Sequence, residues 1–340
     1  MPHAQLSKFL SRLVQGEDLS RDEAGQLLDA LLDENATDSQ IAGALVALAA
    51  KGEAIEELAG MAARLRARCV RLNSRHRCFI DTAGTGSSPA KTFNISTAAA
   101  FVIAGAGLPV AKHGNRAASS KSGSADVLTA LGVNVNALSE VSESSLNEFG
   151  ICFMFAPLYH RATARVAGIR RQLGVRTSFN LLGPLSNPAG APRQIIGVWQ
   201  KELTELLAGV LASLGTERAW VVHGEDGLDE VTISGKTFVA EVHKGEVRTF
   251  QIQPEDFGFA SGKVDHLRGG DIETNARIIK EVLSGERRDE ARDLVLATAA
   301  AALVVGDVAV DLRDGIRLAA ESIDQGAAAR KLAQLVEATN

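Results

Sequence analysis

Several features common in other protein classes are scarce in this sequence of 340 residues. Its three cysteines, Cys69, Cys78 and Cys152, lie far apart without a CxxC pair, which argues against a disulfide framework or zinc site and for a reducing compartment. A formal net charge of −5 argues against a general nucleic-acid or membrane-surface binder. The alanine-rich runs are too short to span a bilayer, and the amphipathic N-terminus does not resemble a signal peptide. We therefore expect a cytoplasmic protein.

Apolar residues make up 46% of the chain, which is ordinary for a globular enzyme, and the length suits two domains. The first 72 residues show only helical spacing. Ser20 with Glu23 and Thr37 with Gln40 are capping boxes that predict helix starts, and Gly52 predicts a helix end. These residues are expected to form a small helical domain.

From Cys78 onward, short apolar runs alternate with glycine- and serine-rich loops and helical patterns. This βαβ rhythm predicts a largely parallel sheet covered by helices. Further strands are expected at residues 195–199, 220–223, 231–234 and 236–242. The sequence thus predicts an α/β domain, residues 73–160 and 186–340, hinged to helical residues 1–72, with a helical return at about 161–185.

The stretch DTAGTGSSPAKTFNIST, residues 81–97, resembles a phosphate loop but matches neither common nucleotide fingerprint. Pro89 replaces the third glycine of GxGxxG, and the P-loop glycines are absent. What remains is a strand, a Gly-Thr-Gly turn and a helix start, where unpaired N–H groups attract anions. The alternative is a helix that follows a tight turn and is capped by Asn94 or Ser96.

A second loop, KHGNRAASSKSGS at residues 112–124, also follows a predicted strand and precedes a helix. It holds three cationic side chains beside histidine and serines. Two such loops at the ends of neighbouring parallel strands would face one crevice, where α/β sheets bind ligands. The sequence therefore favours two anion sites over two solvated turns.

Two further clusters carry possible chemistry. Asp229 and Glu230 follow an apolar run and could supply carboxylates to Mg²⁺, although an exposed acidic turn is the simpler interpretation. The helical stretch 161–173 carries Arg161, Arg165, Arg170 and Arg171. Only Arg170 lies beside the apolar stripe, where it could turn inward and bind a carboxylate.

The motifs GTG…TFNIST, VAKHGNRAASSKSGSADVL, FAPLYH, VRTSFNLLGPLSNP and HGEDGLDE occur in this order over about 150 residues. The chain closely resembles the anthranilate phosphoribosyltransferase family in these motifs and in its leading helices. That resemblance implies transfer of phosphoribosyl from phosphoribosyl pyrophosphate (PRPP) to anthranilate, with release of pyrophosphate. It also implies Mg²⁺, two ions, and a homodimer formed through the helical domain, with no nucleic-acid or membrane partner.

The resemblance also assigns residues by motif. Magnesium would be held by Ser96, Asp229 and Glu230. Anthranilate would contact Asn115 and Arg170, with Gly84 at the junction of the two substrates and with His113, His160 and Pro184 lining its approach. The residues implied to contact PRPP are Gly84, Ser87, Ser88, Thr92, Asn94, Ile95, Ser96, Thr97, Lys112, His113, Gly114, Asn115, Arg116, Ala117, Ala118, Ser119, Ser120 and Ser124. No residue is assigned as a dedicated catalytic acid or base.

One stretch departs from the family. Where the family commonly reads GTGGD-G, this chain has Ser87, Ser88 and Pro89, so a carboxylate is lost and hydroxyls are added. This changes the expected PRPP and magnesium geometry. Two other functions remain open for the same fold: a non-catalytic nucleic-acid- or nucleotide-binding relative, and a pyrimidine nucleoside phosphorylase. Neither would explain Asn115 and Arg170 together with the acidic pair.

Overall fold

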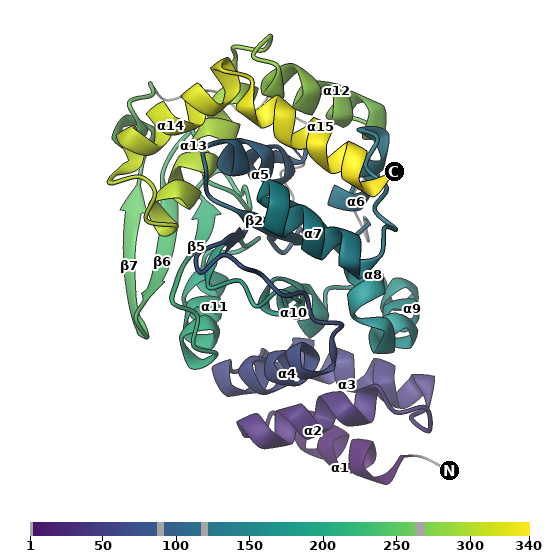
Figure 1. The fold of residues 1–340 in the computed structure, drawn as a ribbon. Helices are drawn as coiled ribbons and strands as arrows, with labels where there is room; N and C mark the ends of the chain where they lie inside the picture. The colour runs from purple at the N-terminus through teal and green to yellow at the C-terminus, as the bar shows by residue number, and fades with distance from the viewer. Residues whose placement is uncertain (1–2, 87–91, 117–121, 261, 263–268) are drawn as a thin grey trace.

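The computed structural model describes residues 3–86, 92–116, 122–260, 262 and 269–340. The chain begins with four helices stacked at one end of the molecule (Figure 1): α1 Ala4–Leu13, α2 Arg21–Leu31, α3 Asp38–Lys51 and α4 Ile55–Arg68. Both predicted capping boxes are formed, by Ser20 with Glu23 and by Thr37 with Gln40. Gly52 ends α3 with φ of 86°, which glycine adopts without strain.

Two later helices return to this end of the molecule. The 3₁₀ turn Arg161–Thr163 leads into α9, Ala164–Leu173, and α10 follows at Ser178–Leu185. Val166 and Ile169 of α9 and Leu182 of α10 share one buried cluster with the leucines of α1 to α4. We call α1 to α4 with α9 and α10 the helical layer.

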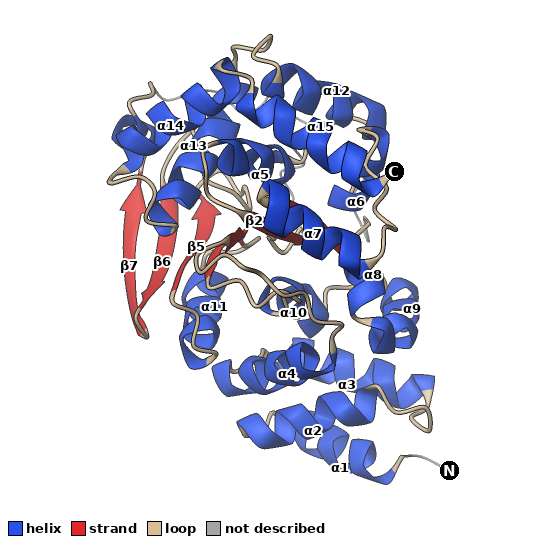
Figure 2. Cartoon of the chain, viewed as in Figure 1, coloured by secondary structure: helices blue, strands red, loops and turns tan. Residues whose placement is uncertain are grey.

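A seven-stranded sheet has the order β3-β2-β1-β4-β5-β6-β7. Figure 2 shows β5, β6 and β7 side by side at one end of it. Neighbouring strands from β3 to β5 are parallel, whereas β6 and β7 pair antiparallel. The predicted mostly parallel sheet is therefore confirmed. The strands are β1 Ile80–Asp81, β2 Val110–Gly114, β3 Ile151–Phe155, β4 Arg193–Gly197, β5 Arg218–Gly224, β6 Thr237–His243 and β7 Glu246–Ile252.

The strand expected at residues 231–234 is wrong. Val231 and Ile233 are buried and alternate as in a strand, but the backbone makes a turn instead. Thr232 N–H donates to Thr237 Oγ1 (3.0 Å), and Ser234 N–H donates to Thr232 Oγ1 (3.1 Å). Side-chain oxygens thus replace a strand neighbour. Strand β7 was not predicted because most of its side chains are exposed, which hides the apolar alternation.

Helices cover both faces of the sheet, and β5 shows how one strand serves both. Trp220 and Val222 belong to the cluster on the face of α5 and α13, while Ala219 and Val221 belong to the cluster shared with the helical layer. The remaining helices are α5 Ile95–Gly105, α6 Ser124–Ala130, α7 Ser139–Phe149, α8 Ala156–Tyr159, α11 Glu202–Ser213, the 3₁₀ turn Pro254–Phe257, α12 Ile272–Leu283, α13 Glu290–Val305, α14 Leu312–Asp324 and α15 Ala327–Thr339.

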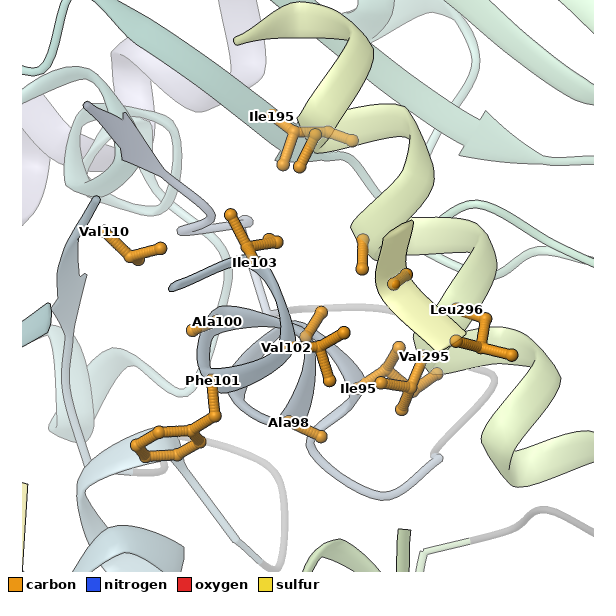
Figure 3. Packing of buried hydrophobic residues seen from close by; sticks show 14 of the residues in the cluster. Ile95, Ala98, Ala100, Phe101, Val102, Ile103, Val110, Ile195, Val295 and Leu296 are labelled. Carbon is orange, nitrogen blue, oxygen red and sulfur yellow. The ribbon is translucent and has the colours of Figure 1, made fainter. Parts of the chain in front are cut away.

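Helix α5 is buried on nearly all sides, which explains its alanine-rich, uniformly apolar sequence. Figure 3 shows Val102 of α5 lying towards Val295 and Leu296 of α13 within the same cluster. The packing fixes the N-terminal turn of α5 at the end of β1. Among the described residues, no helix combines the length and the apolar character needed to cross a membrane.

Candidate active site at the carboxyl edge of the sheet

The two predicted loops meet at one edge of the sheet. β1 and β2 are parallel neighbours, so the segments that follow Asp81 and Gly114 leave the sheet on the same side. Asn94 Nδ2 donates to Ser122 O (3.4 Å), and Ser122 Oγ donates to Asn94 Oδ1 (3.1 Å). Asn94 stands at the N-cap of α5, but its side chain caps nothing there. The structure thus brings the two loops together.

The acidic pair reaches this edge through closely stacked backbones. Thr85 N–H donates to Gly197 O at the end of β4 (2.9 Å). A Cβ at Gly84 would lie 3.1 Å from Gly197 O, and a Cβ at Gly197 would lie 1.6 Å from Asp229 O. Only glycine at position 197 lets the chain before Glu230 pass so close to the end of β4. The sequence analysis did not single out Gly197. The feature that could have identified it is a glycine at the end of an apolar strand.

Ser96 and Glu230 form the centre of a possible metal site. Ser96 N–H in the first turn of α5 donates to Glu230 Oε1 (3.3 Å). Burial and the neighbouring Asp229 raise the pKa of Glu230 to about 8, against the opposing effect of Lys112. Two carboxylates and a hydroxyl are the hard oxygen donors that Mg²⁺ prefers, and a divalent cation there would restore the ionised form of Glu230. The residues present therefore fit magnesium.

Lys112 lies beneath this site with 4% of its surface exposed. Its Nζ donates to Thr82 Oγ1 (2.9 Å), Thr82 O (3.2 Å) and Ser96 Oγ (3.4 Å). Burial lowers the pKa of Lys112, while the charges of Asp81 and Glu230 raise it. The ammonium thus links the end of β1 to the first turn of α5.

Asp81 and Asn187 support the site, although neither was expected as a site residue. The Asp81 carboxylate is fully buried and accepts from Asn187 Nδ2 (2.7 Å), His113 N–H (3.1 Å) and Ala83 N–H (3.1 Å). Burial raises its pKa to about 6 despite the charge of Lys112. Asn187 Nδ2 also donates to Ala111 O (2.9 Å). The only signal was an Asp that begins one motif and an Asn one residue before the end of another.

Arg170 lies on α9 in the helical layer, against the first turn of α10. It is half-buried, its Nη2 donates to Asn180 Oδ1 (3.0 Å), and its Cζ lies 5.5 Å from the ring centroid of Phe179. Within the described chain, its buried Nε has no hydrogen-bond partner, and no carboxylate pairs with the guanidinium. Arg161, Arg165 and Arg171 are exposed, as predicted. Arg170 is half-buried and thus keeps capacity for an anion in a partly desolvated place.

His113 and His160 form a buried pair with ring centroids 5.2 Å apart. Burial, followed by the effect of His160, lowers the pKa of His113 to about 3, and burial lowers that of His160 as well. His113 Nδ1 lies 3.2 Å from Gly183 O, and because a carbonyl only accepts, Nδ1 carries the proton. Both rings are therefore neutral. The next residue, Pro184, is buried in α10, and its carbonyl accepts from Gln194 Nε2 (2.9 Å).

The other expected site residues follow the loops. Asn115 is exposed at the end of β2, and its carbonyl accepts from Ala125 N–H (3.2 Å) and Ser124 Oγ (3.3 Å). Arg116 instead pairs with Asp126 (2.9 Å). Ile95, Ser96 and Thr97 form the first turn of α5, with Thr92 shortly before it and Gly114 ending β2. Ser87, Ser88, Pro89, Ala117, Ala118, Ser119 and Ser120 lie outside the described residues.

Comparison with known proteins gives a consistent result. The profile of the glycosyl transferase family a/b domain matches residues 76–329, and that of the family's helical bundle domain matches residues 7–69. The anthranilate phosphoribosyltransferase of Anaeromyxobacter sp. strain Fw109-5 is 52% identical over 98% of both chains.

Solved structures agree with the sequence comparison. The crystal structure of anthranilate phosphoribosyltransferase from Thermus thermophilus has a TM-score of 0.90 at 39% identity, covering 97% of this chain and 98% of that one. The Saccharomyces cerevisiae enzyme in complex with PRPP and Mg has a TM-score of 0.90 at 29% identity, and in complex with 4-fluoroanthranilate 0.88 at 28%. Both yeast matches cover 99% of this chain and 98% of the other.

Proposed function

The chain belongs to the anthranilate phosphoribosyltransferase family, and we propose that it transfers the 5-phosphoribosyl group of PRPP to the amine of anthranilate, releasing pyrophosphate. This is the second stage of tryptophan biosynthesis from chorismate. One observation carries the proposal: the acidic pair beside the first turn of α5 lies at the edge of the sheet, while Arg170, without a carboxylate partner in the described chain, lies in the helical layer. Such a site suits one phosphorylated and one carboxylate-bearing substrate.

We propose that Ser96, Asp229 and Glu230 hold magnesium, with two ions as the family resemblance implies. Magnesium bound there would neutralise charge on the departing pyrophosphate. The raised pKa of Glu230 supports this assignment, because a carboxylate crowded by Asp229 gains most from a cation. Lys112 would hold Ser96 from beneath through the hydrogen bond between Nζ and Oγ.

PRPP carries a 5-phosphate and a pyrophosphate, so two anion-binding loops match its two anionic groups. We propose that the amides of the first turn of α5 and the loops after β1 and β2 bind it, with the residues assigned by motif. This includes Ser87, Ser88 and residues 117–120, whose placement is not described. The substitution of Ser87-Ser88-Pro89 for the usual family sequence would alter how this loop meets magnesium and pyrophosphate.

On the acceptor side, we propose that Arg170 binds the carboxylate of anthranilate and that Asn115 contacts the same substrate. Gly84 would lie at the junction of the two substrates. His113, His160 and Pro184 would line the approach of anthranilate. Because both imidazoles are neutral, they add no positive charge that would compete with Arg170. An aromatic amine is barely basic, so the reaction needs positioning more than a dedicated general base.

We further propose a homodimer that forms through the helical layer. Val14, at the end of α1, is 68% exposed, and Val46 of α3 is 43% exposed, which leaves apolar surface there. We also propose a cytoplasmic location, where the free thiols of Cys69, Cys78 and Cys152 would stay reduced.

The test is the loss of anthranilate fluorescence when PRPP and Mg²⁺ are added to the purified chain. We expect turnover that requires both additions. No turnover at micromolar enzyme would overturn the proposal. A shift of random DNA at physiological salt would instead favour the nucleic-acid-binding relative, and phosphorolysis of pyrimidine nucleosides would favour the phosphorylase.

A further inference from the structure

A cavity of about 480 Å³ is lined by none of the residues assigned to the two substrates, although Asn187, which bonds Asp81, is part of its wall. Its walls come from Arg66 of α4 and from the two chain segments that join the helical layer to the sheet. Residues 69–79 run from α4 to β1, and residues 186–192 run from α10 to β4. Leu72 N–H donates to Pro188 O (3.3 Å), which ties the two segments together. None of the residues lining this cavity belongs to the acidic pair or to the loops after β1 and β2.

The cavity is strongly cationic. Arg66, Arg71 and Arg77 line it, and the described residues of its lining include no Asp or Glu. Within the described chain, none of the three arginines forms an ion pair, although many other arginines do. The whole chain carries a formal net charge of −5. The positive charge of three guanidinium groups around one cavity therefore contrasts with the negative charge of the protein as a whole. Such a cluster attracts anions by charge and by geometry.

Arg66 is the most enclosed of the three. Its Nε donates to Leu185 O (2.7 Å), which fixes the guanidinium plane and leaves both terminal nitrogens for another partner. Burial lowers the pKa of Arg66, so its charge is held in a partly desolvated place without a counter-ion. A bound anion would supply the missing charge.

The cavity also has apolar walls. Leu72 and Phe79 are buried side chains in its lining, and Pro188 and Pro192 add rigid apolar surface. A volume of about 480 Å³ falls in the range of small-molecule sites, and polar groups beside apolar walls are typical of them.

A neighbouring hollow has the opposite character. It is lined by Glu140, Glu143 and Glu148 together with Arg75, and Arg71 lines both hollows. Arg71 therefore has carboxylates on its other side, whereas Arg66 and Arg77 line only the cationic cavity. This difference identifies Arg77 as the residue to change and Arg75 as its matched control, because both are exposed arginines of the same connecting segment.

We propose that this cavity is a second ligand site, which binds a small organic anion with an apolar body. The anionic group, a carboxylate or a phosphate, is held by Arg66 and Arg77, and the apolar body packs against Phe79 and Pro188. A ligand bound there contacts both connections between the helical layer and the sheet.

The experiment uses benzoate and phenyl phosphate as probes in isothermal titration calorimetry. The full chain carries Arg170→Ala and is saturated with PRPP and Mg²⁺, so the proposed carboxylate and phosphate sites of the reaction are removed or filled. We expect one probe molecule per chain, with Kd below about 1 mM. The tighter probe identifies the anionic group. Adding Arg77→Ala weakens binding about tenfold or more, whereas adding Arg75→Ala changes it less than about twofold.

No saturable binding of either probe up to about 10 mM would overturn the proposal. Equal weakening by Arg77→Ala and Arg75→Ala would also overturn it, because that result indicates general charge attraction. A crystal structure with the tighter probe provides a second, independent readout. The probe must lie between Arg66 and Arg77, and a probe bound anywhere else contradicts the assignment.

Discussion

Ser96 and Glu230 lie on the sheet side of the candidate site, whereas Arg170 lies on α9 in the helical layer. The sheet side combines main-chain contacts that allow no side chain, such as Gly197 against Asp229 O, with the buried hydrogen bonds of Lys112. The helical side is held by side chains, with Arg170 packed on Phe179 and bonded to Asn180. The two substrates should therefore depend on separate parts of the molecule, and changes on one side should spare the other.

The largest expected effect comes from the sheet side. Replacing Asp229→Asn and Glu230→Gln together should lower magnesium-dependent turnover about 100-fold or more, because the cation loses both charged ligands. Activity measured against Mg²⁺ concentration checks this, with circular dichroism to show that the protein stays folded. Glu225→Gln, an exposed carboxylate in the same segment, is the matched control. An unchanged magnesium response in the double variant would remove the pair from the site.

A change on the helical side should affect the other substrate. Arg170→Ala should raise the KM for anthranilate about 10- to 100-fold, since a charge-assisted hydrogen bond contributes about 1.5–3 kcal/mol. The KM for PRPP should change less than about twofold. Steady-state kinetics with each substrate varied in turn measures both constants. Arg171→Ala, which alters an exposed neighbour, should leave them unchanged. Equal increases in the two constants would contradict a division between the two sides.

The smallest effect concerns stability rather than catalysis. Between pH 6.5 and 3 the unfolded chain binds a proton at His113 that the folded chain does not, so the free energy of unfolding falls as pH is lowered. At pH 5 this loss amounts to about 2 kcal/mol for one histidine. His113→Asn keeps a donor for Gly183 O and should flatten the pH dependence.

Urea unfolding at pH 7, 6 and 5 measures this slope. His243→Asn, at an exposed histidine, provides the control and should leave the slope as it is in the unmodified chain. If His113→Asn also leaves the pH dependence of the unfolding free energy unchanged, the surroundings of His113 do not lower its pKa. Water would then reach the imidazole in the folded protein.

Local signals in the sequence predicted much of this architecture. Capping boxes at Ser20 and Thr37 depend on residues three positions apart, and these were correct. The two loops were predicted to share a crevice because parallel strands end at one edge, and Asn94 indeed bonds Ser122. The apolar alternation at Val231 and Ile233 misled because the bend buries both of them and also Thr232 between them, without any strand pairing.

Local sequence patterns could not predict which distant segments of the chain come into contact. Asp81 and Asn187 are 106 positions apart, and neither position shows a periodicity that pairs it with the other. The approach of Gly197 to Asp229 is likewise set by how β4 and the chain after β5 pack. Residue types suggested the acidic pair and Arg170 as binding residues, and the family resemblance named the ligands proposed for them, while the supporting Asp81 and Asn187 appear only in three dimensions.

The helical layer is assembled from pieces that lie far apart in the chain, and this has a consequence for biosynthesis. Val166 and Leu182 complete the apolar cluster of α1 to α4, and β5 and β6 contribute Val221 and Val242. A ribosome makes the N-terminal helices first, at about 5–20 residues per second. Their apolar faces therefore stay exposed for many seconds, until partners about 100 positions later or more have been synthesised. We expect chaperones to bind the nascent helices during this time.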